Sequence, residues 1–275
     1  MSRRPTLHEI ALNAALLALA ALTIAPLLWM VSASFMRPGE AASVPPPLLP
    51  AAPTLEHYVT LFTRLDLTRN LVNSALIAIG STAFSVFLNG MAGYAFAKLR
   101  FPGREKIFAV LLVGLVIPLQ VGMLPLFLMF KTLGLVNTYW GVIVPSMASI
   151  FGIFMVRQYA LAIPNDLLDA ARVDGATEFA IYRRVVLPVI RPILVTLGAF
   201  IFLSAWNDFM WPLIVLSDDR LYTLPVALAN LSGEHVQDTE LMMAGSVLTT
   251  LPVIAIFLLM QKTYIQGVMA GSVKG

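Results

Sequence analysis

The chain has 275 residues, of which 59% are hydrophobic and 12% are charged, and its net charge is +3. Soluble domains contain about 45–50% apolar and about 25% charged residues, so this composition excludes an ordinary soluble domain and predicts a polytopic membrane protein. The absence of cysteine excludes disulfides and thiolate metal sites. The basic residues lie at the ends of apolar runs, which is typical of membrane topology rather than of a nucleic-acid surface.

Two apolar runs in the first third of the chain predict transmembrane helices. Leu12–Val31 is uncharged over about the 20 residues that a helix needs to cross the hydrocarbon core, and we expect it to stay in place as a signal anchor. A polar, proline-rich outer segment runs from Phe35 to Arg69, with a short interfacial helix beginning at His57-Tyr58. Leu71–Ala97 is the second span, and small residues at helical spacing allow another helix to approach it closely, namely Gly90, Gly93 and Ala97.

The third and fourth spans both contain proline. Ile107–Phe130 carries Pro118 and Pro125, which interrupt the ladder of helical hydrogen bonds, so we expect a kink or a short unwound section. Freed carbonyls must face protein or water at membrane depth. Gln120 lies between the two prolines, and it either lines a transport pathway or hydrogen bonds to a neighbouring helix. Tyr139–Val156 forms the fourth span.

Polar and aromatic residues gather in the fifth span, Pro192–Leu216, where the chain reads WNDFMWP. Asp208 is the only ionisable residue placed within a span, and a carboxylate there is costly unless it is paired or hydrated. Asn207 and Asp208, together with Trp206, are chemically suited to the hydroxyl groups of a sugar. The alternatives are that Asp208 lies at the water boundary or caps a helix bent at Pro212, and that the tryptophans form an interfacial belt.

A second outer loop, Ser217–Glu240, leads to the sixth span, Leu241–Gln261, and to an inner tail from Lys262. Six spans put both termini on one side of the membrane. Lys and Arg are then more frequent in the inner segments, which include Arg3, Arg4 and Lys274, than in the outer ones. The positive-inside rule therefore places both termini, and the loop after the fourth span, in the cytoplasm.

That cytoplasmic loop, from Asn165 to Pro192, predicts two short helices. Asn165 can cap the first helix, and carboxylates in its first turns suit the positive end of the helix dipole. Gly175 suits the positive φ with which that helix stops. Thr177 can begin the second helix, and Pro188 bends the chain toward the fifth span.

The loop resembles the EAA loop of ABC-importer permeases, the short cytoplasmic helix by which the membrane subunit docks on its ATPase. The acid-Ala-Ala triplet, the glycine and the Leu-Pro pair have the spacing of that family, although Asp169 stands where the family usually has Glu. An ordinary amphipathic loop helix is the alternative. The resemblance implies that the ATPase-coupling residues are Asp169, Ala170, Ala171, Asp174, Gly175, Ala176, Leu187 and Pro188.

Further stretches resemble carbohydrate-importer permeases of the maltose type, namely PTLEHYVTLF, TRNLVNSALIA, AGYAFAKLRFPG, WNDFMWPL and AGSVKG. The resemblance implies an all-α integral membrane protein with six transmembrane helices in the type I ABC importer permease (MetI-like) fold. We divide the chain accordingly into a signal-anchor helix with its outer segment (1–69), a permease core of five transmembrane helices (70–264) and a cytoplasmic tail (265–275). The core contains the coupling loop, 160–191.

The same resemblance implies a permease of an ATP-driven sugar importer in a bacterial inner membrane. The implied partners are a second homologous permease, a cytoplasmic ABC ATPase dimer, an extracytoplasmic sugar-binding protein and membrane lipid. No cofactor and no nucleic acid are expected.

The residues themselves offer little chemistry of their own. No Gly-Lys dipeptide exists, so a P-loop is excluded. The three histidines, His8, His57 and His235, lie outside the predicted spans, which argues against an embedded hydrolase, a metal site or a proton-driven transporter. We therefore predict no catalytic residues. The alternatives are an importer of another solute, such as glycerol-3-phosphate, and a self-sufficient secondary transporter.

Overall fold

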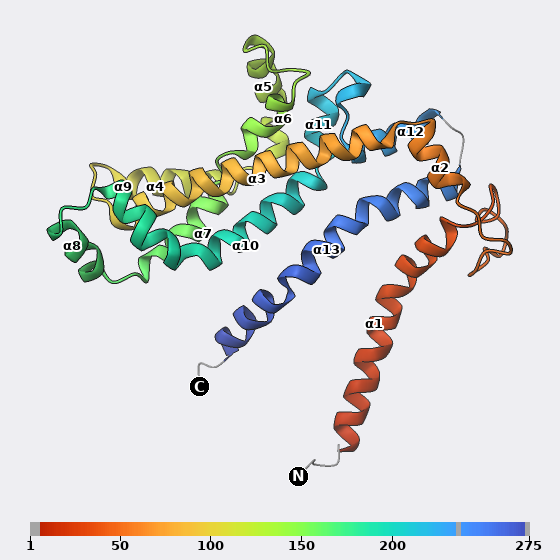
Figure 1. Cartoon of the computed structure of the whole chain (residues 1–275), viewed down its shortest axis with the longest axis horizontal. Coiled ribbons are helices and arrows are strands. Elements are labelled where there is room, and N and C mark those ends of the chain that lie inside the picture. The colour runs from red at the N-terminus through yellow and green to blue at the C-terminus, as the bar shows by residue number, and fades with distance from the viewer. Residues whose placement is uncertain (1–5, 235–237, 273–275) are drawn as a thin grey trace. The chain divides into compact units, whose positions relative to one another are not determined.

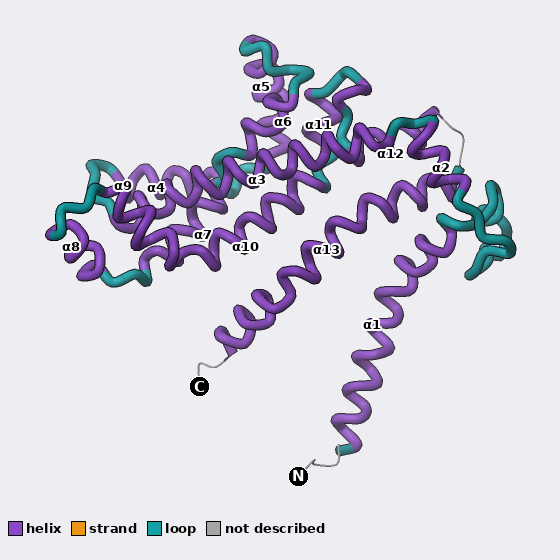
Figure 2. Tube along the Cα trace, viewed as in Figure 1, coloured by secondary structure: helices purple, strands orange, loops and turns teal. Residues whose placement is uncertain are grey.

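The computed structural model describes residues 6–234 and 238–272, and every regular element in these ranges is a helix (Figure 1, Figure 2). The chain divides into two compact units. Unit 1 comprises Met1–Thr68 and Leu228–Gly275, and unit 2 comprises Arg69–Ala227. Some residues used in the sequence analysis lie outside the described ranges, namely Arg3, Arg4, His235 and Lys274.

The described helices account for all six predicted spans. Five of them are single helical stretches, and the sixth is a bent pair formed by α4 (Arg104–Gly114) and α5 (Leu119–Thr132). The five helical stretches that are long and apolar enough to cross a membrane singly are Leu7–Ala33, Leu67–Lys98, Tyr139–Leu161, Glu178–Trp206 and Thr239–Leu259. The expected all-α membrane architecture is thus confirmed.

Unit 1 is built on α1 (Leu7–Ala33), α2 (Glu56–Thr63) and α13 (Thr239–Ser272), and α13 packs against the other two. A capping box starts α1, because the Thr6 hydroxyl accepts from the N–H of Glu9 while the Glu9 carboxylate accepts from the N–H of Thr6. The helix α2 confirms the short helix expected near His57.

Carboxylates organise the segment between α1 and α2. Glu40 accepts hydrogen bonds from the backbone N–H groups of Arg37 and Ala51, at 3.0 and 2.7 Å. Glu240, which is buried near the start of α13, accepts from the N–H of Ala41 at 2.7 Å. These bonds satisfy backbone donors that no helix pairs, so they define the path of this loop.

Unit 2 is arranged around α3 (Leu67–Lys98). After α4 and α5, the chain continues through α6 (Tyr139–Ser146), α7 (Ile150–Leu161), α8 (Asn165–Val173), α9 (Glu178–Ile181), the π-helical turn η1 (Tyr182–Val186), α10 (Leu187–Trp206), α11 (Met210–Val215) and the 3-10 turn η2 (Asp219–Leu221). The next helix, α12 (Leu224–Glu234), begins in unit 2 and belongs to unit 1 from Leu228 onward.

In two of the predicted spans the helix is interrupted. The kink expected in the third span is confirmed, because α4 and α5 meet at an angle of 103° and Pro118 precedes α5 in an extended conformation. Pro125 lies inside α5 without ending it. The fourth span is interrupted before Ser149, whose hydroxyl caps α7 while its N–H donates to the Asn89 side chain at 3.0 Å.

The fifth span differs from its predicted bounds of 192–216. Its helix begins at Glu178 and runs without interruption through η1 and α10 to Trp206. The N–H of Leu187 donates to Tyr182, five residues earlier, so the π-helical turn accommodates Pro188 without a break. At the other end, Asn207 leaves the helical conformation, and α11 is a separate short helix.

Small residues on α3 allow close packing, as the sequence predicted. A Cβ atom on Gly90 would lie 2.7 Å from the Tyr182 hydroxyl, and one on Gly93 would lie 2.6 Å from Val156. Ala97 is buried in the same core, which joins α3, α7, α8 and α10. This core fixes the end of unit 2 that carries the predicted coupling residues.

Candidate functional site

One buried leucine anchors α8 to the core of unit 2. Leu168 is 1% exposed and packs among residues of α3, α7 and α10. The opposite face of α8 is open, with Leu167 and Val173 exposed by 47% and 88%. Ala170 lies between them at helical spacing and is also exposed. The helix therefore combines one face that is fixed in the core with one exposed face, which carries Leu167, Ala170 and Val173 beside Asp166.

The turn after α8 is held by backbone geometry. Gly175 has φ +81, which confirms the expected left-handed residue. The N–H of Gly175 donates to Arg172, and the N–H of Ala176 donates to Ala171, which together form a Schellman motif. Thr177 then starts α9 as predicted, since its hydroxyl accepts from the N–H of Ala180 at 3.3 Å.

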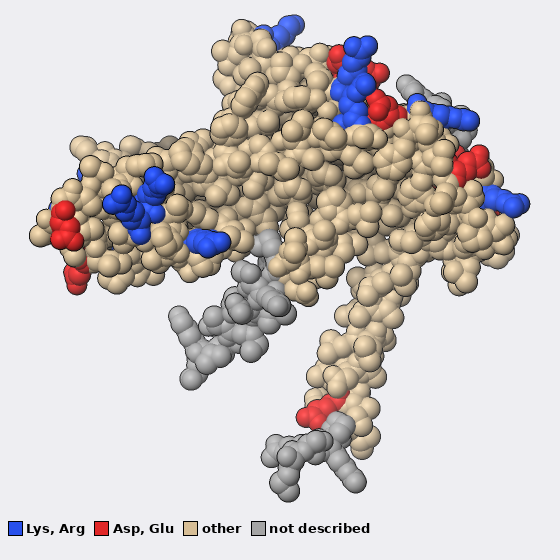
Figure 3. Space-filling view, in the orientation of Figure 1, with Lys and Arg blue, Asp and Glu red and all other residues tan. Residues whose placement is uncertain are grey.

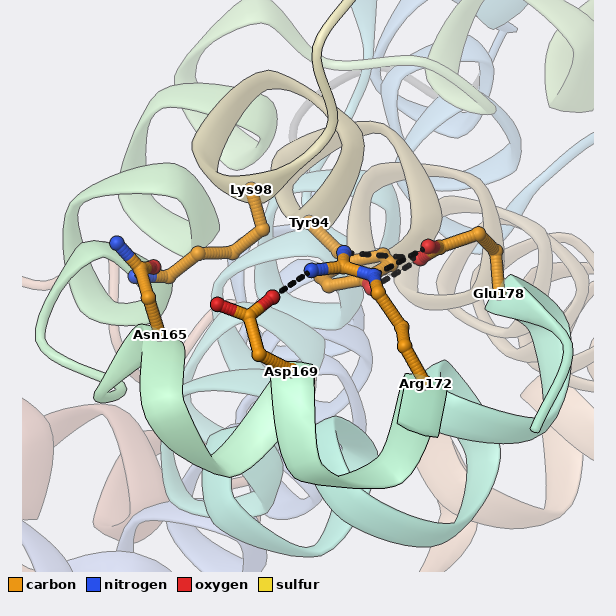
Figure 4. A network of polar contacts seen from close by, with 6 residues as sticks. All are labelled: Tyr94, Lys98, Asn165, Asp169, Arg172 and Glu178. Carbon is orange, nitrogen blue, oxygen red and sulfur yellow. Dashed lines mark hydrogen bonds and ion pairs between the residues drawn. The ribbon is translucent and has the colours of Figure 1, made fainter. Parts of the chain in front are cut away.

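An arginine joins the two helices on either side of this turn (Figure 4). The Arg172 Nη1 donates to Asp169 at 2.6 Å, and its Nε donates to Glu178 at 2.8 Å. The bonds to Glu178, and then those to Asp169, raise the pKa of Arg172 above its already high usual value. Arg172 therefore stays charged, and its bonds to Asp169 and Glu178 hold α8 and α9 together across the turn.

Two residues of α3 connect the turn to the membrane helices (Figure 4). The Tyr94 hydroxyl donates to the Glu178 carboxylate at 2.9 Å. The Lys98 Nζ donates to the carbonyl of Ile163 at 2.6 Å and to the Asn165 side chain at 3.0 Å. The end of α3 is thus bonded to the first residue of α8 and to the first residue of α9.

The cap predicted at Asn165 is wrong. Pro164 precedes the helix, and no side chain caps the α8 N-terminus. Asn165 is the first residue of α8, and its side-chain oxygen accepts from Lys98 instead. Proline supplies the extended conformation before the helix, which frees the amide for the distant lysine.

The structure places most of the predicted coupling residues around this turn. Asp169, Ala170 and Asp174 lie on its exposed side, and Ala171 and Ala176 are partly buried against the core. Gly175 forms the turn itself. Leu187 and Pro188 lie beyond η1 at the start of α10, where Leu187 packs on the core and Pro188 is exposed.

The predicted pathway residues have different environments. Gln120 is exposed in the first turn of α5, just after the bend. Asn207 is exposed where α10 ends, and Asp208, half-buried, accepts from the N–H of Trp211 at 3.4 Å. Trp206 is 4% exposed, and its ring is stacked on that of Phe202. Gln120 and Asn207 are therefore exposed polar groups, and Asp208 is a partly buried one.

The sequence analysis missed several residues that hold the site together. Tyr94 and Lys98 lie at the end of a long apolar span, and Arg172 and Glu178 read as ordinary surface charges. One local signal existed for Arg172, because Asp169 stands three residues before it on the same helix. The partners of Tyr94 and Lys98 are 84 and 67 residues away, so no local pattern predicts them.

The chain is similar to known proteins over most of its length. Residues 89–269 match the family described as "Binding-protein-dependent transport system inner membrane component". The arabinooligosaccharides transport system permease protein AraQ of Halalkalibacterium halodurans is 38% identical over 264 residues, covering 94% of this chain and 93% of that protein. AraQ of Bacillus subtilis is 43% identical over 206 residues, covering 74% of this chain and 72% of that protein.

A solved structure shows the same fold. It is that of a bacterial ABC transporter involved in the import of the acidic polysaccharide alginate, with a TM-score of 0.82 and 22% identity. The match covers 95% of this chain and 99% of that chain. Given the family match and the two relatives, the chain belongs to the family of inner membrane components of binding-protein-dependent transport systems and is a permease subunit of an ABC importer.

Proposed function

We propose that this permease imports an oligosaccharide, with arabino-oligosaccharides as the first candidates. The observation that supports the proposal is the similarity to AraQ of Halalkalibacterium halodurans along 94% of the chain. The permease forms the translocation path with a second, homologous permease. A cytoplasmic ABC ATPase dimer supplies the energy, and an extracytoplasmic binding protein delivers the sugar.

The α8–α9 segment is proposed as the site that receives movement from the ATPase. Its open face offers Leu167, Ala170 and Val173 to a partner, while Leu168 holds the other face in the core. The Schellman turn and Arg172 make the segment move as one piece. A shift imposed on α8 is then passed on through the hydrogen bonds of Lys98 and Tyr94 to α3, and through the continuous helix to α10.

The proposed path for the sugar passes Gln120, Asn207 and Asp208. Amide and carboxylate oxygens accept hydrogen bonds from sugar hydroxyls, and none of these three residues is basic. An anionic solute such as glycerol-3-phosphate would favour basic groups or helix N-termini along the path, so a neutral sugar is the better match. Trp206 is proposed to support the neighbouring Asn207 and Asp208 from within the protein, because its ring is buried.

The proposed topology keeps both termini in the cytoplasm, as the distribution of Lys and Arg indicates. The outer segment before residue 69 and the outer loop from 217 to 240 then face the binding protein. The core from 70 to 264 holds the five remaining spans and the coupling loop, and the tail from 265 to 275 returns to the cytoplasm.

Uptake measurements test the substrate and the energy source together. Cells producing this permease with its partner permease, ATPase and binding protein should accumulate labelled arabino-oligosaccharides, and removal of this chain should abolish uptake. Accumulation of glycerol-3-phosphate but no sugar would overturn the substrate class. Sugar accumulation by this chain alone in liposomes with an ion gradient would show a secondary transporter instead.

A further inference from the structure

An apolar groove lies on the surface of unit 2 between α3 and the helix that runs from α9 into α10. Its volume is about 560 Å³. Val86 and Phe87 of α3 form one wall, and Leu187 and Leu194 of α10 form the other. The site network at Arg172 does not use this groove, and none of the predicted pathway residues lines it.

The groove carries charge at one end only. Among the described residues that line it, Arg183 is the only charged one, and Phe179 lies one helical turn before it at the same end. Neither Arg183 nor the adjacent Arg184 forms an ion pair within the described part of the chain, and both are exposed. Lys and Arg side chains also gather over the end of unit 2 that carries α8 and α9 (Figure 3).

The groove is about as long as one leaflet of a membrane is thick. A helix rises about 1.5 Å per residue, so Arg183 and Leu194 are separated by about 16 Å along the axis. The hydrocarbon core of a bilayer is about 30 Å thick, and one leaflet therefore spans about 15 Å. An acyl chain that enters beside Arg183 could therefore lie along the groove as far as Leu194.

We propose that this groove binds an anionic phospholipid of the inner leaflet. One acyl chain lies between α3 and α10, and the phosphate is held by Arg183 with support from Arg184. Basic pockets between transmembrane helices on the cytoplasmic side are suited to such headgroups. The assignment to the inner leaflet rests on the proposed function, which places α8 in the cytoplasm.

A bound lipid at this position would act on the coupling site. The groove is lined by Phe179, Tyr182 and Leu187, which belong to the stretch between the coupling turn and α10. The Tyr182 ring also packs in the core beside Gly90 and Tyr94. The lipid therefore stabilises the stretch through which movement of α8 reaches the membrane helices.

Native mass spectrometry of the complete transporter tests the headgroup. The complex extracted in mild detergent should retain phosphatidylglycerol. Titration with phosphatidylglycerol should then give an affinity about fivefold weaker for the Arg183→Gln complex than for the unaltered one, since a basic residue near an anionic surface contributes about 1 kcal/mol. Arg100→Gln removes an exposed charge elsewhere on unit 2 and should bind as the unaltered complex does. Equal affinity in all three complexes, or equal retention of phosphatidylcholine, would overturn the proposal.

A crosslinking experiment tests the occupant of the groove. Phe87 is 54% exposed in the groove wall, and a photo-crosslinking benzoylphenylalanine placed there should capture phospholipid in membranes. Ala83→Trp fills the groove without changing its charge and should abolish that capture. Capture of the second permease, or of another part of this chain, would show that protein covers the groove. Because both readouts measure lipid and not sugar, they remain informative if the proposed substrate is wrong.

Discussion

Replacing Gly175 with valine should uncouple ATP hydrolysis from transport. Gly175 has φ +81, and a Cβ atom built there would have no heavy atom within 4 Å. The substitution therefore causes no collision, and its whole effect lies in the backbone. An L-residue in the left-handed region costs roughly 1–2 kcal/mol, which changes the population of a conformation by about 5–30-fold. The α8–α9 turn should then spend much of its time in other conformations.

A matched control is available at the other end of unit 2. Gly134 has φ +68 and equally open surroundings, so Gly134→Val imposes the same backbone strain away from the coupling turn. Asparagine tolerates the left-handed conformation, and Gly175→Asn should restore function. The assay is sugar transported per ATP hydrolysed by the reconstituted complex. Normal stoichiometry in Gly175→Val at a normal protein level would refute the reasoning.

The remaining predictions concern the residues around that turn and the path. Arg172→Gln should lower the free energy of unfolding by no more than about 1 kcal/mol for each exposed ion pair lost. It should nevertheless reduce the sugar transported per ATP, because residue 172 no longer joins Glu178 of α9 to α8. An unchanged amount of sugar transported per ATP would contradict this prediction. Leu168→Ala should destabilise the protein in detergent by about 2–5 kcal/mol. Leu167→Ala, at an exposed position, should change stability by no more than about 0.5 kcal/mol but should weaken ATPase binding. A larger loss of stability in Leu167→Ala than in Leu168→Ala would contradict the orientation of α8. Asp208→Ala should raise the sugar concentration needed for half-maximal uptake, and unaltered rate and affinity would assign Asp208 a purely structural role.

Local rules predicted the parts of the fold that depend on neighbouring residues. Gly175 and Thr177 were predictable because a left-handed stop and a hydroxyl cap are properties of a few consecutive residues. The packing at Gly90 and Gly93 was also predictable, since small residues at helical spacing on an apolar span have few other uses. The bend at Pro118 follows from the missing N–H of proline.

Other features depend on residues far apart in the sequence. Asn165 has the chemistry of a cap, but a lysine 67 residues away occupies its side-chain oxygen. The continuous fifth helix was missed because Pro188 normally ends a helix, whereas here a π-helical turn shifts the hydrogen bonds before it. That helix ends at Trp206, directly before the polar pair Asn207-Asp208, whereas the predicted span continued to Leu216. The coupling and pathway roles of the named residues stay predictions.

The central claim is that the open face of α8 contacts the ATPase, and a single cysteine tests it most directly. The chain contains no cysteine, so Val173→Cys, at a position 88% exposed, introduces a unique thiol. Leu49→Cys, at a position 76% exposed in the segment between α1 and α2, is the control, because the proposed topology places this segment outside the cytoplasm. With a thiol-directed photo-crosslinker in membranes containing the whole transporter, we expect position 173 to capture the ATPase and position 49 to capture none of it. Capture of the ATPase from position 49, or of lipid alone from position 173, would contradict the account.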